Sequence, residues 1–405
     1  HVYDTNTGAI RQLTFHDDFD VMWPSGTGNQ LVYESGGYLY RLDLDTEEVE
    51  RVVVNIKYDF ANTLPYRKNV KENIHSMAIS PSGNRVLFDA RGDIFSVPAG
   101  EGTIFNLTQS EGVRAVYPQW SPDGKWIAYM DDSSGEYEIY LLENKEFATP
   151  KQVTHNSQGW KYQPLWSPDS RYLVFFDRTM NLQLLDTETN NITIVDRATA
   201  EEIRHYNFSP DSKWITYAKS SRNGLGAIWV YNIEDGKPIQ LTDNEYSESN
   251  PVFSNCGHYI FFTSNRDFNL TFSDFEFNYL YNRATRMYAL HLSADSPRLF
   301  EPKETTEKKG SPEENTTESS ASDSGRRGRS AASQDSDPND TPGARIDFEG
   351  IQSRIVAFPL PAGSYWGLQP VKDGLVYFTD GGMFRYQLAE QNSQQIMEGI
   401  RSAVV

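Results

Sequence analysis

The stretch Trp120-Ser121-Pro122-Asp123-Gly124-Lys125-Trp126-Ile127-Ala128-Tyr129 decides the fold, because it joins two strand-like runs through a tight turn. Proline fixes φ at the first central position of such a turn, and Asp-Gly tolerates the φ values that follow. After the turn the residues alternate between two sets, as the two faces of a strand require. The stretch therefore predicts a β-hairpin.

The same turn returns at a nearly constant spacing. Its other copies are Ser80-Pro81-Ser82-Gly83, Ser167-Pro168-Asp169-Ser170, Ser209-Pro210-Asp211-Ser212 and a weaker one, Ser254-Asn255-Cys256-Gly257. The separations between successive serines run from 41 to 46 residues. A strand-built period of about 40–45 residues is typical of propeller blades, with one four-stranded sheet per repeat. The sequence thus predicts an all-β chain of β-propeller architecture.

Composition fits this fold class and excludes several kinds of partner. The 405 residues include 23 Tyr and 22 Phe, which can fill the interfaces between sheets. A net charge of −19 repels phosphate backbones, so we expect no nucleic-acid partner. No apolar run approaches the ~20 residues that span a bilayer, so we expect no membrane partner. The single Cys256 cannot form an intrachain disulfide, which fits the cytosol without excluding the periplasm.

The repeats predict two propellers. Residues 1–56 are interpreted as the last blades of a first propeller, and residues 57–73 break the strand rhythm and mark a boundary. Residues 57–405 are interpreted as a second propeller. Its predicted blades span 74–109, 114–155, 160–196, 202–243, 248–360 and 365–398. Because the chain begins inside a strand and Ile400–Val405 resembles the first strand of another blade, we expect a fragment truncated at both ends.

An insertion interrupts the fifth of these blades. Residues 301–342 contain no Leu, Ile, Val or aromatic residue, and hold ten acidic residues against six basic ones. Such a segment cannot bury enough apolar surface to offset its ordering entropy. We therefore expect 301–342 to be a disordered loop, with a docking tail as the alternative.

The residues themselves predict a scaffold without an active site. The position five residues before each repeat serine belongs to the first strand of a blade, which faces the central channel of a propeller. It is occupied by His75, Val116, Tyr162, Arg204 and Ser249. This mixed set has no metal-ligand regularity, and the sequence has neither a glycine-rich phosphate loop nor a Gly-x-Ser-x-Gly elbow. We expect no cofactor and no metal.

Three segments are more specific than the turns, which generic TolB-type and WD40-like repeats share. They are Phe261-Phe262-Thr263-Ser264-Asn265-Arg266-Asp267-Phe268-Asn269, Asn62-Thr63-Leu64-Pro65-Tyr66-Arg67-Lys68 and Ile346-Asp347-Phe348-Glu349-Gly350-Ile351. With these segments the chain resembles the tricorn protease family over essentially its whole length. The resemblance implies the end of a six-bladed propeller followed by most of a seven-bladed one.

The resemblance also implies a function. The chain would be the non-catalytic propeller region of a serine peptidase that degrades oligopeptides, acting as a sieve and channel for peptide substrates. The catalytic lobes and a PDZ-like domain would lie beyond Val405, so no catalytic residue is assigned here. A homo-oligomer in the cytoplasm is implied, with the periplasm as the alternative location. Two other functions stay open, a TolB-like interaction scaffold and a propeller attached to a prolyl-oligopeptidase-like hydrolase.

Basic residues near the blade strands are the candidates for substrate contact. A free peptide carboxylate that is steered along the channel needs a cation, and Arg91, Arg204 and Arg266 are placed to provide one. The alternative is that each forms a salt bridge on the surface or between blades, because carboxylates are abundant in this chain.

Overall fold

Two compact units, His1–Lys68 and Asn69–Val405, make up the chain. The computed structural model describes residues 1–58, 64, 66–145, 148–155, 159–267, 270–272, 279–281, 283–300 and 343–400. The division at Lys68 falls inside the predicted boundary segment 57–73, later than the limit expected at residue 56. The predicted insertion 301–342 and most of the truncated strand predicted at Ile400–Val405 lie outside the described residues.

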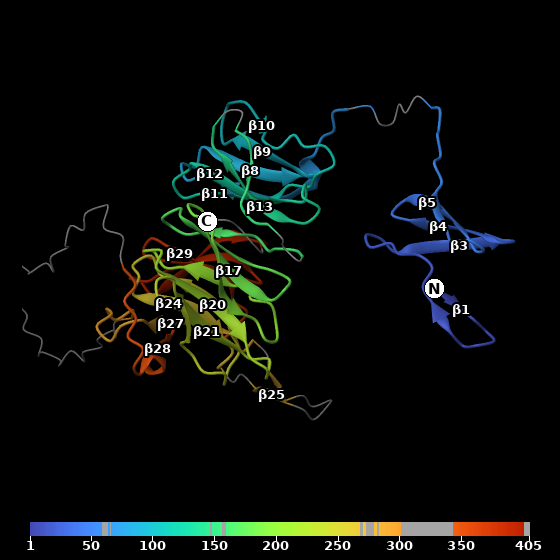
Figure 1. The fold of residues 1–405 in the computed structure, drawn as a ribbon. Helices are drawn as coiled ribbons and strands as arrows, with labels where there is room; N and C mark the ends of the chain where they lie inside the picture. The colour runs from blue at the N-terminus through green and yellow to red at the C-terminus, as the bar shows by residue number, and fades with distance from the viewer. Residues whose placement is uncertain are drawn as a thin grey trace, which may run out of the picture. The chain divides into compact units, whose positions relative to one another are not determined.

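The first unit contains one complete sheet. The strands β3 (Val21–Thr27), β4 (Gln30–Ser35), β5 (Tyr38–Asp43) and β6 (Val49–Arg51) pair in chain order (Figure 1). A separate two-stranded sheet precedes them, made of β1 (Val2–Tyr3) and β2 (Ile10–Arg11). This unit is therefore built from strands, as the β-propeller fold class predicts.

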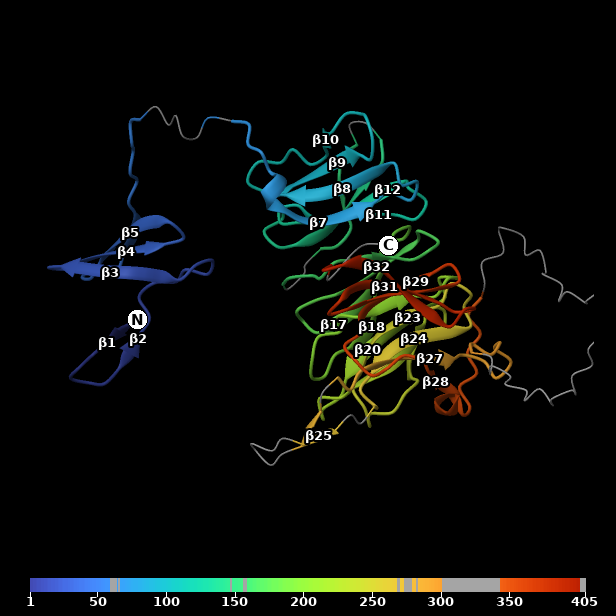
Figure 2. The same ribbon diagram turned by 180° about the vertical axis from the view of Figure 1, so that it is seen from behind.

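The described residues of the second unit form six four-stranded antiparallel sheets, one for each predicted blade; Figures 1 and 2 show them from opposite sides. The first sheet consists of β7 (Ile74–Ile79), β8 (Arg85–Ala90), β9 (Asp93–Pro98) and β10 (Phe105–Asn106). The second consists of β11 (Val116–Trp120), β12 (Trp126–Asp131), β13 (Glu138–Glu143) and β14 (Lys151–Gln152). The third consists of β15 (Leu165–Trp166), β16 (Tyr172–Phe176), β17 (Asn181–Asp186) and β18 (Ile192–Arg197).

The remaining sheets continue the same meander. The fourth consists of β19 (Tyr206–Phe208), β20 (Trp214–Ser220), β21 (Gly226–Asn232) and β22 (Lys237–Gln240). The fifth consists of β23 (Glu248–Phe253), β24 (Tyr259–Ser264), β27 (Arg286–His291) and β28 (Ile355–Ala357). The sixth consists of β29 (Trp366–Val371), β30 (Gly374–Thr379), β31 (Gly382–Gln387) and β32 (Asn392–Glu398). Short 3-10 helices, η2 (Lys71–Asn73) and η3 (Ile351–Arg354), are the helical elements of the described residues.

The fifth sheet contains a feature that the sequence analysis did not predict. A hairpin of β25 (Leu270–Phe272) and β26 (Tyr279–Tyr281) forms its own two-stranded sheet between β24 and β27. The four-stranded order therefore runs from β24 directly to β27. The aromatic stretch Phe261–Asn269, which ends just before β25, was interpreted only as a family marker, because no Ser-Pro-Asp turn or other spacing signal precedes the hairpin.

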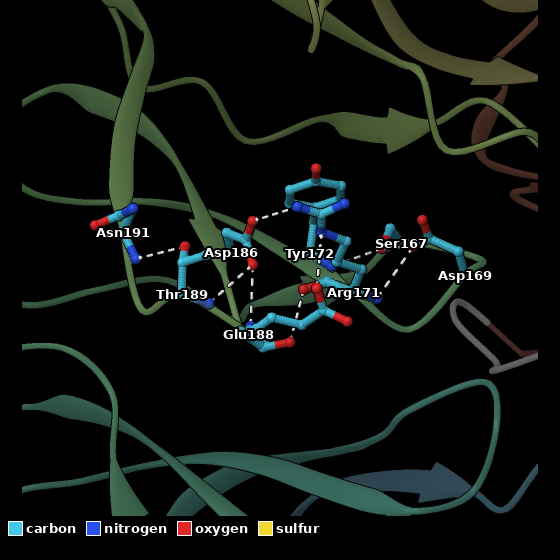
Figure 3. Close-up of polar contacts among 9 residues, drawn as sticks. Ser167, Asp169, Arg171, Tyr172, Asp186, Glu188, Thr189 and Asn191 are labelled. Carbon is cyan, nitrogen blue, oxygen red and sulfur yellow. Dashed lines mark hydrogen bonds and ion pairs between the residues drawn. The ribbon is translucent and has the colours of Figure 1, made fainter.

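The repeated turn owes its geometry to its serine. In all five copies the serine Oγ accepts the N–H of the residue five positions later, at 2.8–3.1 Å. In three copies the same hydroxyl also donates to the aspartate two positions later, and Figure 3 shows the copy at Ser167. The residue after the aspartate is Gly124, Ser170 or Ser212, and each has a positive φ of 58–72°. These hydrogen bonds satisfy the backbone of the turn without solvent, so the serines can be buried.

The turns also join neighbouring sheets. The Asp123 N–H donates to the Ser170 hydroxyl at 3.0 Å, and the Asp169 N–H donates to the Ser212 hydroxyl at 3.0 Å. Serine in place of glycine at the fourth turn position thus links the second, third and fourth sheets.

The core lies between the sheets rather than within one layer. One cluster combines Val174, Phe176 and Leu182 of the third sheet with Ile215 and Tyr217 of the fourth, all fully buried. The first strands of successive sheets are neighbours, β7 with β11, β11 with β15, β19 with β23 and β23 with β29. Radially packed four-stranded sheets with adjacent first strands define a β-propeller.

Candidate functional site

Several first strands carry a β-bulge with a strained residue. The register shifts between Val116 and Gln119 in the second sheet and between Ser249 and Val252 in the fifth. Tyr117 and Asn250 lie in these bulges with φ of 54°, and each precedes a proline. A bulky residue with positive φ is uncommon, and such strain concentrates where side chains are aimed at a ligand.

A buried carboxylate of the neighbouring sheet holds the Tyr117 bulge. Asp89 on β8 is 1% exposed and accepts the Tyr117 N–H at 3.0 Å and the Ser76 N–H at 2.6 Å. The His75 Nδ1 lies 3.5 Å from the same carboxylate, and the His75 ring meets the Tyr117 ring edge-on at 5.1 Å. The first sheet therefore fixes the position of Tyr117 on the second.

A pocket of about 540 Å³ opens on the first strands of the second, third and fourth sheets. We call it the first-strand pocket. Its aromatic, aliphatic and charged lining residues are Tyr117, Trp160, Tyr162, Leu165, Arg204 and Tyr206, and Gln119, Gln163 and Pro164 complete the lining. The Tyr117 and Trp160 rings meet edge-on at 6.5 Å, and Trp160 also packs on Tyr137 at 4.4 Å. The pocket is therefore an aromatic wall with one cation.

Glu202 holds two of the polar side chains that line the first-strand pocket. It accepts the Tyr162 hydroxyl at 2.5 Å, and its other oxygen accepts the Arg204 Nε and Nη2 at 3.0 and 2.7 Å. The hydrogen bond from Tyr162, followed by that from Arg204, holds the pKa of Glu202 below its usual value. The Tyr206 hydroxyl donates to the Gln163 carbonyl at 2.9 Å. Two of the rings are thus fixed through their hydroxyl groups.

A buried ion pair anchors the segment that carries Trp160. The Lys161 Nζ lies 2.9 Å from Glu138 and donates to the Tyr137 carbonyl at 2.8 Å. The side chains of Lys161 and Glu138 are 4% and 3% exposed. Burial lowers the pKa of Lys161, and Thr154 donates to the same Glu138 oxygen. This pair joins the second and third sheets, and Lys161 stands in the chain between Trp160 and Tyr162, which line the pocket.

The three arginines predicted as substrate contacts lie apart. Arg204 precedes β19 and lines the first-strand pocket, with 68% of its side chain exposed. Arg91 lies in the β8–β9 turn with φ of 54° and lines a different pocket, of about 600 Å³, next to Arg114. Arg266 follows β24 and is paired with the fully buried carboxylate of Glu248.

The arrangement around Arg266 is that of a structural ion pair. Its guanidinium lies 5.1 Å from the centre of the Tyr246 ring and 4.9 Å from that of Tyr288. Burial raises the pKa of Glu248, because the ionised carboxyl has lost its water. The Arg266 guanidinium offsets the desolvation of the Glu248 carboxylate in the same sheet. Its charge is therefore already paired and is not available to a substrate carboxylate.

Sequence reasoning identified Tyr162 and Arg204 by their spacing from the repeat serines, but missed Tyr117 and Trp160. A signal for the bulges was present, since Pro118, Pro164 and Pro251 each precede a repeat serine by three residues. Proline restricts the residue before it and cannot donate to a neighbouring strand, so a break in strand pairing at this position could have been predicted.

In the described part of the chain, no three or more His, Cys, Asp or Glu side chains are grouped so that they could hold a metal ion. Over the same residues, no helix is long and apolar enough to cross a membrane.

A comparison with protein-family models identifies the family to which the second unit belongs. The protein-family model for the tricorn protease second beta propeller domain matches residues 74–398. The chain belongs to the tricorn protease family. The matched range begins with β7 and ends with β32, so it contains all six sheets of the second unit and the first-strand pocket. The sequence-based expectation of a tricorn-family propeller region is confirmed.

Curated tricorn relatives match almost the whole chain. Tricorn protease homolog 1 from Streptomyces coelicolor (strain ATCC BAA-471 / A3(2) / M145) is 24% identical over 378 residues, which are 91% of this chain and 33% of the relative. The tricorn protease homolog from Saccharolobus solfataricus is 20% identical over 389 residues, 95% of this chain and 32% of the relative. The chain therefore spans about a third of the length of these tricorn relatives.

A solved tricorn structure has the same fold. The crystal structure of the tricorn protease aligns with 98% of this chain and 37% of its own, with a TM-score of 0.64 and 14% sequence identity. At this identity the likeness concerns the arrangement of the sheets, and the residues of the first-strand pocket have to be interpreted from their own geometry.

Proposed function

We propose that this chain is the non-catalytic propeller region of a serine peptidase that degrades oligopeptides, and that its second propeller admits peptides along the first strands. One observation carries the proposal: an open aromatic pocket lies on the first strands of a propeller whose relatives are named proteases. The first strands of a propeller surround its central channel, where a threaded peptide has to pass.

The dimensions and chemistry of the pocket suit an extended chain. A volume of about 540 Å³ holds a few side chains but no folded domain. Aromatic rings interact with many kinds of side chain, as a channel for varied peptides requires. In this proposal the propeller excludes folded proteins by size and lets unfolded chains through.

Catalysis belongs to other domains in this proposal. The sequence has no nucleophile and base in a recognisable context, so the 405-residue chain alone should not cleave fluorogenic peptides. Cleavage that copurifies with the chain through several steps would contradict this. The homo-oligomer and the cytoplasmic location are parts of the same proposal.

A competition experiment tests the sieve. An unstructured fluorescent peptide is bound to the chain and followed by anisotropy, and a small disulfide-bonded protein is added either native or reduced and alkylated. The reduced form should compete because it is unfolded, and the native form should not. Equal competition by both forms, or stronger competition by the native form, would contradict the sieve and favour an interaction scaffold.

A further inference from the structure

The first-strand pocket has a more selective chemistry than a sieve needs. Tyr162 and Tyr206 are held by hydrogen bonds through their hydroxyl groups, and the Tyr117 bulge is held by Asp89. Rings that are fixed in advance lose little conformational entropy when a ligand binds. The backbone strain at Tyr117 is maintained by a neighbouring sheet, which is the pattern of a pre-organised binding site.

The charges of the pocket exclude ionic side chains. Arg204 donates two N–H groups to Glu202, so the two charges cancel. A cationic side chain of a ligand would meet the exposed Arg204, and an acidic one would be repelled by the net charge of −19 while Arg204 is already neutralised by Glu202. A neutral ligand group meets neither penalty. Among neutral groups, an aromatic ring gains most from a wall of rings, through edge-on and stacked contacts.

Arg204 can also donate hydrogen bonds to a ligand. A guanidinium carries five N–H donors, and only two of them are used by Glu202. Because 68% of the Arg204 side chain is exposed beside the rings, the remaining donors can reach a ligand carbonyl. An extended peptide presents such a carbonyl next to each of its side chains.

We infer that the first-strand pocket is a subsite for an aromatic side chain of an extended peptide, whose backbone carbonyl accepts a hydrogen bond from Arg204. This inference rests on the proposed function, because it takes a peptide as the ligand. It adds a preference to the channel, which would retain peptides at aromatic residues and let other sequences pass faster.

Blocked peptides test the subsite without a free carboxylate. The series is acetyl-Ala-Ala-X-Ala-Ala-amide with X as Phe, Trp, Lys, Glu or Ala, and dissociation constants are measured by NMR titration of the full chain. Phe and Trp peptides should bind about two- to tenfold more tightly than the Ala peptide. Lys and Glu peptides should bind no better than the Ala peptide.

A pair of variants supplies the control. Trp160 and Trp126 are both half-buried and pack against the same core cluster, but only Trp160 defines the pocket. Trp160→Leu should remove the preference for Phe, and Trp126→Leu should keep it. If Trp160→Leu does not fold, the exposed Arg204→Gln replaces it and should weaken all five peptides by a similar factor.

Each outcome is decisive. A preference for Lys or Glu, or a Phe preference that survives in Trp160→Leu, would overturn the subsite. If no blocked peptide binds while the reduced protein still competes in the sieve experiment, the subsite is wrong and the channel stands. If neither binds, the proposed function fails as well.

Discussion

The two ends of the sheets in the second unit differ in how they use their residues. At the end of the Ser-Pro-Asp turns, which we call the turn end, Ser121, Ser167 and Ser209 are all buried and make the same hydrogen bonds. At the opposite end, which we call the bulge end, equivalent positions carry different residues, such as Tyr162 and Arg204. Repetition thus maintains the fold at the turn end and leaves the bulge end free to acquire a site.

The sheets are joined differently at the two ends. At the turn end, the same hydrogen bond is repeated: an aspartate N–H in the turn of one sheet donates to the hydroxyl of Ser170 or Ser212, the fourth residue of the turn in the next sheet. The bulge end uses individual clamps, which are Asp89 for the Tyr117 bulge and the Glu138–Lys161 pair next to Trp160 in the chain. A clamp of buried charges is costly to break, because the remaining partner is left without compensation.

The largest expected effect concerns the Glu138–Lys161 clamp. Glu138→Ala leaves Lys161 buried without its carboxylate, and should lower the free energy of unfolding by about 3–5 kcal/mol in urea denaturation. The double variant Glu138→Leu with Lys161→Met removes both charges and should recover much of this loss. A loss under about 1 kcal/mol for the single variant would show that the bulge end is not held by this pair.

A smaller effect is expected at the turn end. Ser167→Ala removes the acceptor of the Tyr172 N–H at a buried position, and should cost about 1–3 kcal/mol in the same assay. Ser134→Ala is the matched control, because its hydroxyl bonds a carbonyl in an exposed loop, and should change stability by less than about 0.5 kcal/mol. Equal losses of unfolding free energy in the two variants would contradict a special structural role for the repeat serine.

The Arg171–Asp186 ion pair at the turn end allows the stability contribution of a surface ion pair to be compared with that of the serine hydrogen bond in the same turn (Figure 3). It joins the residue before β16 to the last residue of β17 at 2.8 Å, with 43% of the Arg171 side chain exposed. Burial alone would raise the pKa of Asp186, but hydrogen bonds from Arg171 and from the backbone of Thr189 and Glu188 outweigh it and lower the pKa. Because the pair is exposed, Arg171→Met should cost about 1 kcal/mol or less. A loss as large as that of Ser167→Ala would contradict this ranking.

The smallest expected effect concerns the pH response of the pocket. Since the pKa of Glu202 is lowered in the folded chain, its contribution to stability is present above the pKa of the unfolded chain and is lost as the pH falls through the folded pKa. Tyr162→Phe removes the hydrogen bond that contributes most to this shift, so the pKa of Glu202 should rise toward its usual value. An NMR titration of the Glu202 carboxyl carbon measures it, and an unchanged titration would contradict the arrangement around Glu202.

The predictable part of the molecule is the part that repeats. The turn spacing predicted five of the six sheets of the second unit, because each serine turn fixes a local hydrogen-bond pattern that needs no distant partner, and the sixth was predicted from its strand-like runs alone. The clamps could not be predicted, since Glu138 and Lys161 belong to different repeats and their pairing depends on how the sheets pack. The β25–β26 hairpin was missed because it stands outside the period. The sequence could not distinguish the roles of the predicted arginines. In the structure, Arg204 is exposed and lines a pocket, whereas Arg266 is paired with the buried carboxylate of Glu248 and has a structural role.

The most direct test of the account asks where a peptide contacts the chain. An unstructured peptide that carries a benzophenone amino acid is irradiated with the protein, and the crosslinked residues are identified by mass spectrometry, with excess unlabelled peptide as the control. The account predicts crosslinks at the first-strand pocket, within 117–119, 160–165 and 204–206. Competed crosslinks at the Ser-Pro-Asp turns or on the fourth strands of the sheets, with none in the pocket, would contradict it.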